Sequence, residues 1–218
     1  MQQNLFSNNE TFELAGNARL ELRRQWCVDH AELFQQLSTL PDLKQETLLM
    51  GGKEVLTPRL QAWYGDPGAA MRYSGARFNP KPIPAFLYPI KNQLQIECGV
   101  DFNSVLVNCY RNEEDGVGWH ADDEHELGVN PFIASLSLGE SRRFSIRPNL
   151  ERLANTNPIN SVSSGLKPLN NKALDLQLSS GDLLLMSGGL QRFWQHRVPK
   201  ESKNCSERIN LTFRWVQN

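Results

Sequence analysis

Two histidines and one aspartate have the types and spacing of a metal site. His120 and Asp122 are separated by a single residue, and His196 lies far downstream in the strand-like segment FWQHRV. Residues two apart on an extended segment point to the same side, so both side chains can reach one ion. His-x-Asp alone also occurs at polar strand ends, and a lone histidine is usually a core residue. Together, two histidines and one carboxylate on one face predict a site for non-haem iron(II) with open coordination positions.

The last strand-like segment, RINLTFRWV, alternates strictly between polar and apolar residues. A solvated polar face is the ordinary interpretation, but the closing strand of a small barrel would turn these polar residues into the lumen. Buried guanidinium groups are costly without an anion, and arginine pairs well with carboxylates. The segment SVLVNCY has the same pattern and offers neutral hydrogen bonds. The two segments therefore predict a dicarboxylate site formed by Arg208, Asn210, Thr212, Arg214, Asn108 and Tyr110.

The elements that must position these residues divide the chain into two halves. Residues 1–25 are expected to form an irregular leader. A helix capped by Asp29 is expected to end before Pro41, and a second helix is expected over Pro84–Val100. From Phe102 onward, short strand-like segments separated by turn residues are typical of a β-sandwich or jelly roll. The sequence thus predicts an α+β fold with the chemistry on its β half.

Composition limits the class of protein. The 218 residues, 39% hydrophobic, suit one globular domain. No apolar run approaches the roughly 20 residues that span a bilayer, and the N-terminus lacks the features of a signal peptide. Four widely spaced cysteines and a net charge of −1 argue against a disulfide framework and a bulk nucleic-acid binder. We expect a monomer without membrane contact in the cytoplasm, or in the nucleus of a eukaryotic cell.

Several long motifs resemble one enzyme family. The run NSVLVNCYRNEEDGVGWHADDEHELGVNPFIASLSLGESRRFSIR resembles the catalytic core of AlkB-type dioxygenases, as do GDLLLMSG, QHRVPK and RINLTFR. The segment PRLQAWYGDPGAAMRYSGARFNPKPIP is similar to the lid of the branch that repairs alkylated DNA. The resemblance implies a double-stranded β-helix (jelly roll) core with N-terminal helices and a nucleotide-recognition lid. Residues 1–45 would be the leader and helix, 46–101 the lid and its helix, and 102–218 the core, with 46–218 as a single catalytic domain.

The resemblance also implies an activity and its cofactors. The chain would repair N-alkylated DNA bases of the 1-methyladenine and 3-methylcytosine type with Fe(II), O2 and 2-oxoglutarate, releasing formaldehyde, succinate and CO2. His120, Asp122 and His196 would be the catalytic iron ligands. Arg208 would pair with the distal carboxylate of 2-oxoglutarate, helped by Tyr110 and Asn210. Three residues would lie near its keto-acid end: Asn108, Thr212 and Arg214.

The substrate side of the site is less specific in sequence. A base inside a duplex must be flipped out or single-stranded to reach buried iron. The residues expected near the base are Tyr73, Trp63, Tyr64, Asp123 and Glu124, for which lid packing or a solvated acidic turn is the alternative. Leu49 and Met50, at an expected hairpin tip, would wedge into a duplex or pack on the body. The candidates for phosphate contacts are Arg142, Arg143, Arg197 and Lys200, which solvated surface positions would equally explain.

Other functions stay open at this stage. The nearest is demethylation of RNA bases or of a protein side chain by an enzyme of the same family. A second is a non-enzymatic nucleic-acid-binding β-barrel, against which the complete triad and both arginines argue. A third is a jelly roll that holds zinc or manganese for other chemistry.

Overall fold

Two antiparallel sheets form the centre of the molecule. The computed structural model describes residues 9–50, 52–73, 76–155 and 172–217, and its larger sheet has seven strands. In sheet order these are β1 (Asn9–Leu14), β2 (Ala18–Arg23), β13 (Leu183–Gly188), β10 (Ile133–Gly139), β15 (Arg208–Arg214), β8 (Ser104–Tyr110) and β5 (Leu60–Gly65). Most neighbours in this sheet are distant in sequence, so the sheet assembles through long-range contacts.

The smaller sheet faces the larger one. Its order is β12 (Leu174–Leu178), β11 (Arg142–Pro148), β14 (Trp194–Val198) and β9 (Val117–His120). β11, β12 and β14 alternate between residues that point toward the larger sheet and residues that point outward. In β9 the register with β14 shifts, and Val117 and His120 both line the pocket. Side chains from both sheets form one buried apolar cluster, which includes Phe144, Ile146, Leu184 and Trp194. Two facing antiparallel sheets with crossing connections confirm the expected jelly-roll core.

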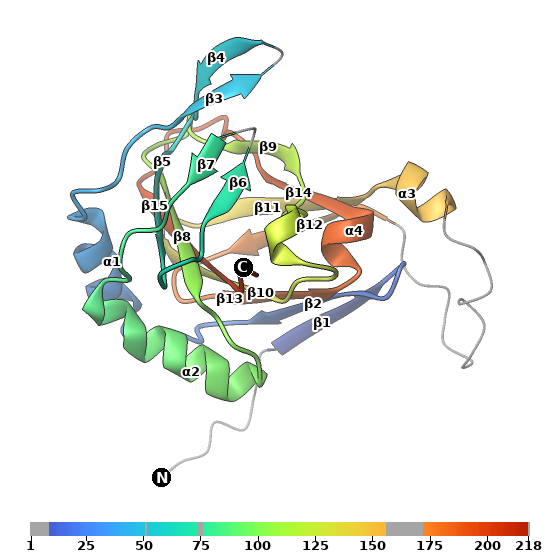
Figure 1. The fold of residues 1–218 in the computed structure, drawn as a ribbon, viewed down its shortest axis with the longest axis horizontal. Helices are drawn as coiled ribbons and strands as arrows, with labels where there is room; N and C mark the ends of the chain where they lie inside the picture. Colours follow the sequence, from blue (N-terminus) through green and yellow to red (C-terminus); the bar gives the residue numbers. More distant parts are fainter. Residues whose placement is uncertain (1–8, 51, 74–75, 156–171, 218) are drawn as a thin grey trace.

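Helices cover the other face of the larger sheet. α1 (His30–Ser38) packs on β10 and β15, and α2 (Tyr88–Cys98), introduced by the 3-10 turn η1 (Ala85–Leu87), lies along the same side (Figure 1). The second helix ends at Gly99, whose φ of 66° is a left-handed conformation that glycine adopts without strain. Both expected helices are therefore present. Asp29 precedes α1, but its side chain makes no capping hydrogen bond.

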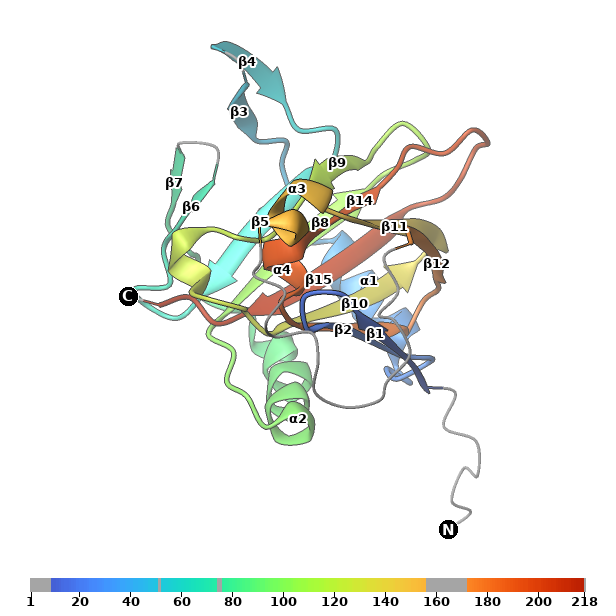
Figure 2. The same ribbon diagram turned by 90° about the vertical axis from the view of Figure 1, so that its right-hand side faces the viewer.

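The remaining elements are short and lie outside the two main sheets. They are η2 (His125–Leu127), α3 (Leu150–Ala154) and α4 (Leu190–Phe193), together with two hairpins, β3 (Thr47–Met50) with β4 (Lys53–Leu56) and β6 (Met71–Tyr73) with β7 (Ala76–Phe78). Figure 2 shows both hairpins projecting from the body on one side. None of the helices in the described ranges is long and apolar enough to cross a membrane.

The expectation of an irregular leader is wrong for residues 9–23. β1 and β2 form a hairpin, and β2 pairs with β13 along its whole length. The reason is visible in the sequence: Ala18, Leu20 and Leu22 alternate with polar residues and are all fully buried against the core. The N-terminal segment is thus part of the larger sheet.

Candidate functional site

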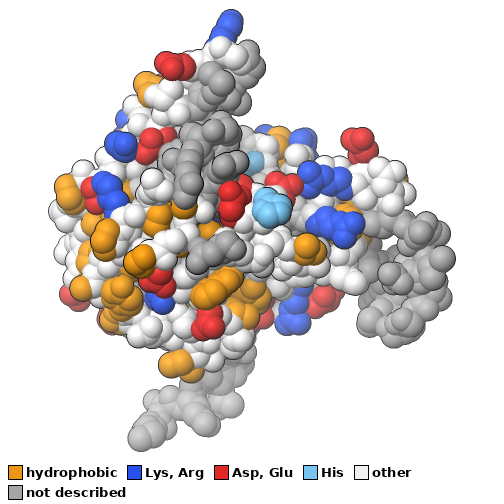
Figure 3. Space-filling model, viewed as in Figure 1, with side chains coloured by type: hydrophobic (Ala, Val, Ile, Leu, Met, Phe, Trp, Pro, Cys, Tyr) orange, Lys and Arg blue, Asp and Glu red, His pale blue; other side chains and the backbone are white. Residues whose placement is uncertain are grey.

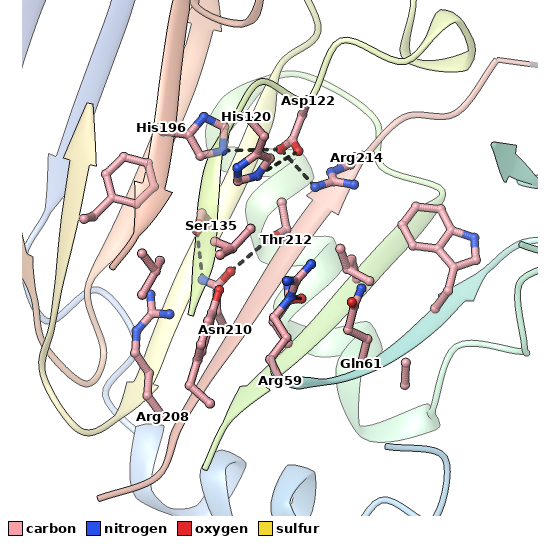
Figure 4. Close-up of a pocket in the computed structure, with 18 of the residues that line it drawn as sticks. Arg59, Gln61, His120, Asp122, Ser135, His196, Arg208, Asn210, Thr212 and Arg214 are labelled. Carbon is pink, nitrogen blue, oxygen red and sulfur yellow. Dashed lines mark hydrogen bonds and ion pairs between the residues drawn. The ribbon is translucent and has the colours of Figure 1, made fainter. Parts of the chain in front are cut away.

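The two histidines and the aspartate meet between the sheets. β9 ends at His120, and the register of β14 places His196 directly opposite it, with ring centroids 4.3 Å apart. Nε2 of His120 lies 3.7 Å from Oδ1 of Asp122, and Nε2 of His196 lies 4.0 Å from Oδ2. One ligand atom from each residue falls within 4.8 Å of the others. Figure 4 shows the three side chains converging on one point.

The surroundings orient these three side chains for metal binding. Nδ1 of His120 lies 2.9 Å from the carbonyl oxygen of Gly118, which favours a proton on Nδ1 and leaves Nε2 free to bind a metal. The backbone N–H of Asp122 donates to Oε1 of the buried Gln191 at 3.0 Å. Phe144 stacks on the ring of His196 at 5.3 Å. The cluster is therefore held in place by neighbouring side chains and backbone.

Electrostatics keep the cluster in the protonation state that a metal requires. Burial, together with the neighbouring His120, lowers the pKa of His196 to about 3, so the ring is neutral at physiological pH. Burial alone would raise the pKa of Asp122, but Arg214 and the two histidines outweigh it and lower that pKa. Two neutral imidazoles and one carboxylate are the donor set that suits Fe(II) with open positions.

A second set of polar side chains lies on the neighbouring wall. β15 turns its polar face into the pocket, with Arg208 opposite Tyr110 and Asn210 opposite Asn108 in the register with β8. The amide of Asn210 donates to Ser135 Oγ at 2.9 Å, and Thr212 donates to the Asn210 amide oxygen at 3.0 Å (Figure 4). The structure thus brings together all the residues expected to bind the dicarboxylate.

Arg208 is buried without a carboxylate partner among the described residues. It is 2% exposed, and it donates one hydrogen bond, to Ser137 Oγ at 2.9 Å. Its Nε and Nη1 atoms are buried and have no hydrogen-bond partner in the part of the chain that the structure describes. Burial lowers the pKa of this guanidinium. A buried cation with free donors is stable only beside an anion, and a carboxylate of 2-oxoglutarate fits this requirement.

Several polar pocket residues, Glu46 among them, were not found from sequence. Arg59, just before β5, is buried and donates from Nε to Asn108 Oδ1 at 2.8 Å. Gln61 and Ser135 also line the pocket. The segment PRLQAW contains the alternation Arg59, Gln61, Trp63 that would have indicated a common face.

The expected base-stacking residues separate onto two faces of β5. Trp63 lines the pocket and donates from its indole nitrogen to the Ala69 carbonyl at 3.0 Å. Tyr64 points to the opposite face, is 2% exposed in the core, and donates to Asp42 at 3.2 Å. Tyr64 therefore lies away from the pocket. The side chain of Tyr73, in β6, lies outside the described residues.

Of the two acidic residues that follow Asp122, one lines the pocket and the other is exposed. Glu124 lines the pocket, where burial and the nearby Asp122 raise its pKa to about 7. Asp123 is exposed and forms an ion pair with Arg152 at 2.7 Å. In Figure 3, acidic and histidine side chains gather near the centre of this face, and basic side chains border them toward α3 and α4.

The residues expected to contact phosphates lie in different environments, one buried and the others at the surface. Arg142 is 1% exposed, and its guanidinium donates to the carbonyl oxygens of Asn112, Asp115 and Pro199. The phosphate contact expected of Arg142 does not fit this position, because the side chain is buried and both of its Nη atoms donate inside the protein. Arg143 and Arg197 lie on the outer face of the smaller sheet, and Lys200 is exposed after β14. The side chains of Leu49 and Met50, at the end of β3, lie outside the described residues.

Comparisons with known proteins identify the family of this chain. Residues 28–214 match the model of the 2OG-Fe(II) oxygenase superfamily. Human "Alpha-ketoglutarate-dependent dioxygenase alkB homolog 3" is 39% identical over 84% of this chain and 60% of its own length. Human "DNA oxidative demethylase ALKBH2" is 37% identical over 85% of this chain and 68% of its own length. The chain thus spans less than two thirds of the alkB homolog 3 proteins that it matches.

A solved structure supports the fold. "The structure of OsALKBH1" superposes with a TM-score of 0.57 and 19% identity, covering 91% of this chain and 96% of the other. At this identity the likeness concerns the fold alone. The family model and the two human relatives lead to one conclusion: the chain belongs to the 2OG-Fe(II) oxygenase superfamily and, within it, to the AlkB-type dioxygenases.

Proposed function

We propose that this protein is an oxidative demethylase that repairs N-alkylated bases, of the 1-methyladenine and 3-methylcytosine type, in DNA. One observation carries the proposal. A single pocket holds the His120, Asp122 and His196 cluster on one wall and the unpaired cation Arg208 on the next. The names of the two human relatives, a dioxygenase and a DNA oxidative demethylase, support the reaction and the substrate.

Each wall of the pocket has a separate task in this proposal. His120, Asp122 and His196 would hold Fe(II), which supplies oxidation of an N-methyl carbon by O2 with 2-oxoglutarate as co-substrate. Arg208 would bind a carboxylate of 2-oxoglutarate in two-pronged geometry. Apolar residues such as Phe144 and Met186 line the same pocket and limit the access of water.

The third wall suits a flat, cationic base. Trp63 and Leu106 pair across β5 and β8 and form an apolar surface. The carboxyl group of Glu124 lines the same pocket and offers a hydrogen-bond acceptor. A methylated adenine or cytosine carries a positive charge that such a group would stabilise. Tyr73, Leu49 and Met50 remain part of the proposal as lid residues that contact the base or the duplex, and we propose a monomer because one chain supplies all three walls.

A direct test follows the mass of an oligonucleotide. A 1-methyladenine oligonucleotide, single- or double-stranded, is incubated with the protein, Fe(II), 2-oxoglutarate and ascorbate, and its mass is measured. The expected result is loss of one CH2 unit that depends on 2-oxoglutarate. His196→Ala should abolish the loss, and His30→Ala, which removes a histidine outside the pocket, should not.

Two other outcomes would contradict the proposal in different ways. Succinate formed without any change in the DNA would keep the dioxygenase chemistry and assign the substrate to RNA or protein. Neither product, with correctly folded and iron-loaded protein, would overturn the assignment of the metal site to this reaction.

A further inference from the structure

The outer face of the smaller sheet carries a group of arginines around one tryptophan. Strand alternation places it: His120, Phe144 and His196 point inward, so their neighbours along β9, β11 and β14 point outward. Among the outward residues are Trp119, Arg143, Ser145, Arg147 and Arg197, which we call the outer arginine face.

Contacts across three strands hold this face together. The guanidinium carbon of Arg147 lies 4.2 Å from the ring centroid of Trp119, and that of Arg197 lies 4.5 Å from it. The β11–β14 register places Ser145 opposite Arg197. Nη2 of Arg147 donates to Oε1 of Gln195 at 2.9 Å. Arg147 and Arg197 are therefore held side by side by their packing on Trp119.

The arginines have charge and donors that the described protein leaves unused. None of Arg143, Arg147 and Arg197 forms an ion pair with a carboxylate in the ranges that the structure describes. The Nε atoms of Arg143 and Arg197 and the hydroxyl of Ser145 are shielded from solvent without a hydrogen-bond partner there. Asp175 lies opposite Ser145 in the register with β12 but pairs with none of the three. Such a cluster favours an anion with several oxygen acceptors.

The position of this face relates it to the pocket. Trp119 directly precedes the candidate metal ligand His120. The outer arginine face and the candidate metal ligands His120 and His196 therefore lie on opposite faces of the smaller sheet. The β3–β4 hairpin projects from the same side of the molecule in both views (Figures 1 and 2). A nucleic-acid strand with one base in the pocket would pass near this side.

We propose that the outer arginine face binds the phosphate backbone of single-stranded DNA that flanks the base in the pocket. The inference rests on the proposed function, because it takes the bound strand to be the substrate strand. Phosphate oxygens accept from the terminal guanidinium N–H groups of these arginines, and the positive charge of the face attracts the strand. The face thus extends substrate recognition beyond the flipped base to the strand around it.

The test measures binding of unmodified DNA to metal-free protein. Fluorescence anisotropy with a labelled single-stranded thymidine oligonucleotide gives the dissociation constant at several salt concentrations. Arg143→Met and Arg197→Met should each weaken binding about fivefold at low salt and lower the salt slope by about 0.7, the value for one phosphate contact on a single strand. Arg197→Lys, which keeps the charge, should bind within about twofold of wild type.

The control is Lys91→Met on α2, which makes the same change in net charge on the opposite side of the molecule. If Arg143→Met and Arg197→Met, folded as judged by thermal melting, bind DNA as this control does, the proposal is wrong. Loss of binding to an RNA of equal length, with DNA binding unchanged, would also overturn it. Because the assay needs neither iron nor an alkylated base, its result is independent of whether demethylation is observed.

Discussion

Nη2 of Arg214 lies 2.9 Å from Oδ2 of Asp122, the same carboxylate that faces the two histidines. Both residues are buried, and they come from different elements, β15 and the loop after β9. Arg214, which lies on the same strand as Arg208, therefore connects that strand to the candidate metal ligand Asp122. Burial alone would raise the pKa of Asp122, and the charge of Arg214, together with the two histidines, lowers it and keeps the carboxylate ionised.

We expect Arg214→Met to destabilise the metal-free protein by about 3 kcal/mol, because a buried carboxylate then loses its cation. Denaturant unfolding in the presence of a chelator would measure this loss. Mn(II) should restore part of the stability, since it supplies positive charge to Asp122. Arg19→Met, at an exposed arginine, serves as the control. An unchanged free energy of unfolding would show that the ion pair contributes nothing.

A divalent metal should stabilise the folded protein through the cluster. At a concentration about 100 times its dissociation constant, Mn(II) adds about 2.7 kcal/mol, which is about 5 to 10 °C in Tm for a domain of this size. Thermal melting would detect it. His120→Ala, Asp122→Ala and His196→Ala should each abolish the shift, and His30→Ala should retain it. A shift that survives in the triad variants would place the metal elsewhere.

Arg208→Met should separate ligand binding from stability. Loss of the guanidinium should raise the dissociation constant of 2-oxoglutarate about 100-fold, in the range for truncating one partner of a buried charge pair. Titration calorimetry with Mn(II)-loaded protein would measure it. The ligand-free protein should be no less stable than wild type, because Arg208 is a buried cation with unpaired donors. An unchanged affinity for 2-oxoglutarate would exclude this role.

Arg142 and Arg143 are neighbours in sequence, but we expect their replacement to change the free energy of unfolding by different amounts. Arg142→Met should lower the free energy of unfolding by about 3 kcal/mol, because the carbonyl oxygens of Asn112, Asp115 and Pro199 lose a charged donor. Arg143→Met should stay within about 0.5 kcal/mol of wild type. Equal losses in the two variants would mean that Arg142 does not connect the segment of Asn112 and Asp115 to the segment of Pro199.

Asp115 should make stability depend on pH in acid. Burial would raise its pKa, but hydrogen bonds from the side chain and backbone of Arg111 outweigh burial and lower it. Because the folded pKa lies below the unfolded one, this contribution is present above the unfolded value of about 4 and is lost as pH falls through the folded value. Asp115→Asn should be less stable at pH 7, and its stability should fall less between pH 5 and 3. Parallel curves for the two proteins would exclude the linkage.

The sequence by itself determined the strands and which residues share a face. The alternation in RINLTFRWV and SVLVNCY is local, because the period of two is a property of the extended backbone. It indicated that Arg208, Asn210 and Thr212 would act together, and the structure brings them into one pocket. The same alternation was present in ARLELR, where the leader was expected. The local signal for a strand is therefore present in this segment as well.

Only the tertiary structure decided which face points inward. β11 has arginines at both kinds of position, and its pairing with β12 and β14 turned Arg142 inward and Arg143 outward. In β5, the same choice put Trp63 in the pocket and Tyr64 in the core. Alternation determines which residues of a strand share a face. Which of the two faces is buried depends on sheet pairing between residues far apart in the chain. For that reason Arg59 could not be assigned to the pocket from the sequence alone. Its hydrogen bond to Asn108 depends on the pairing of β5 with β8.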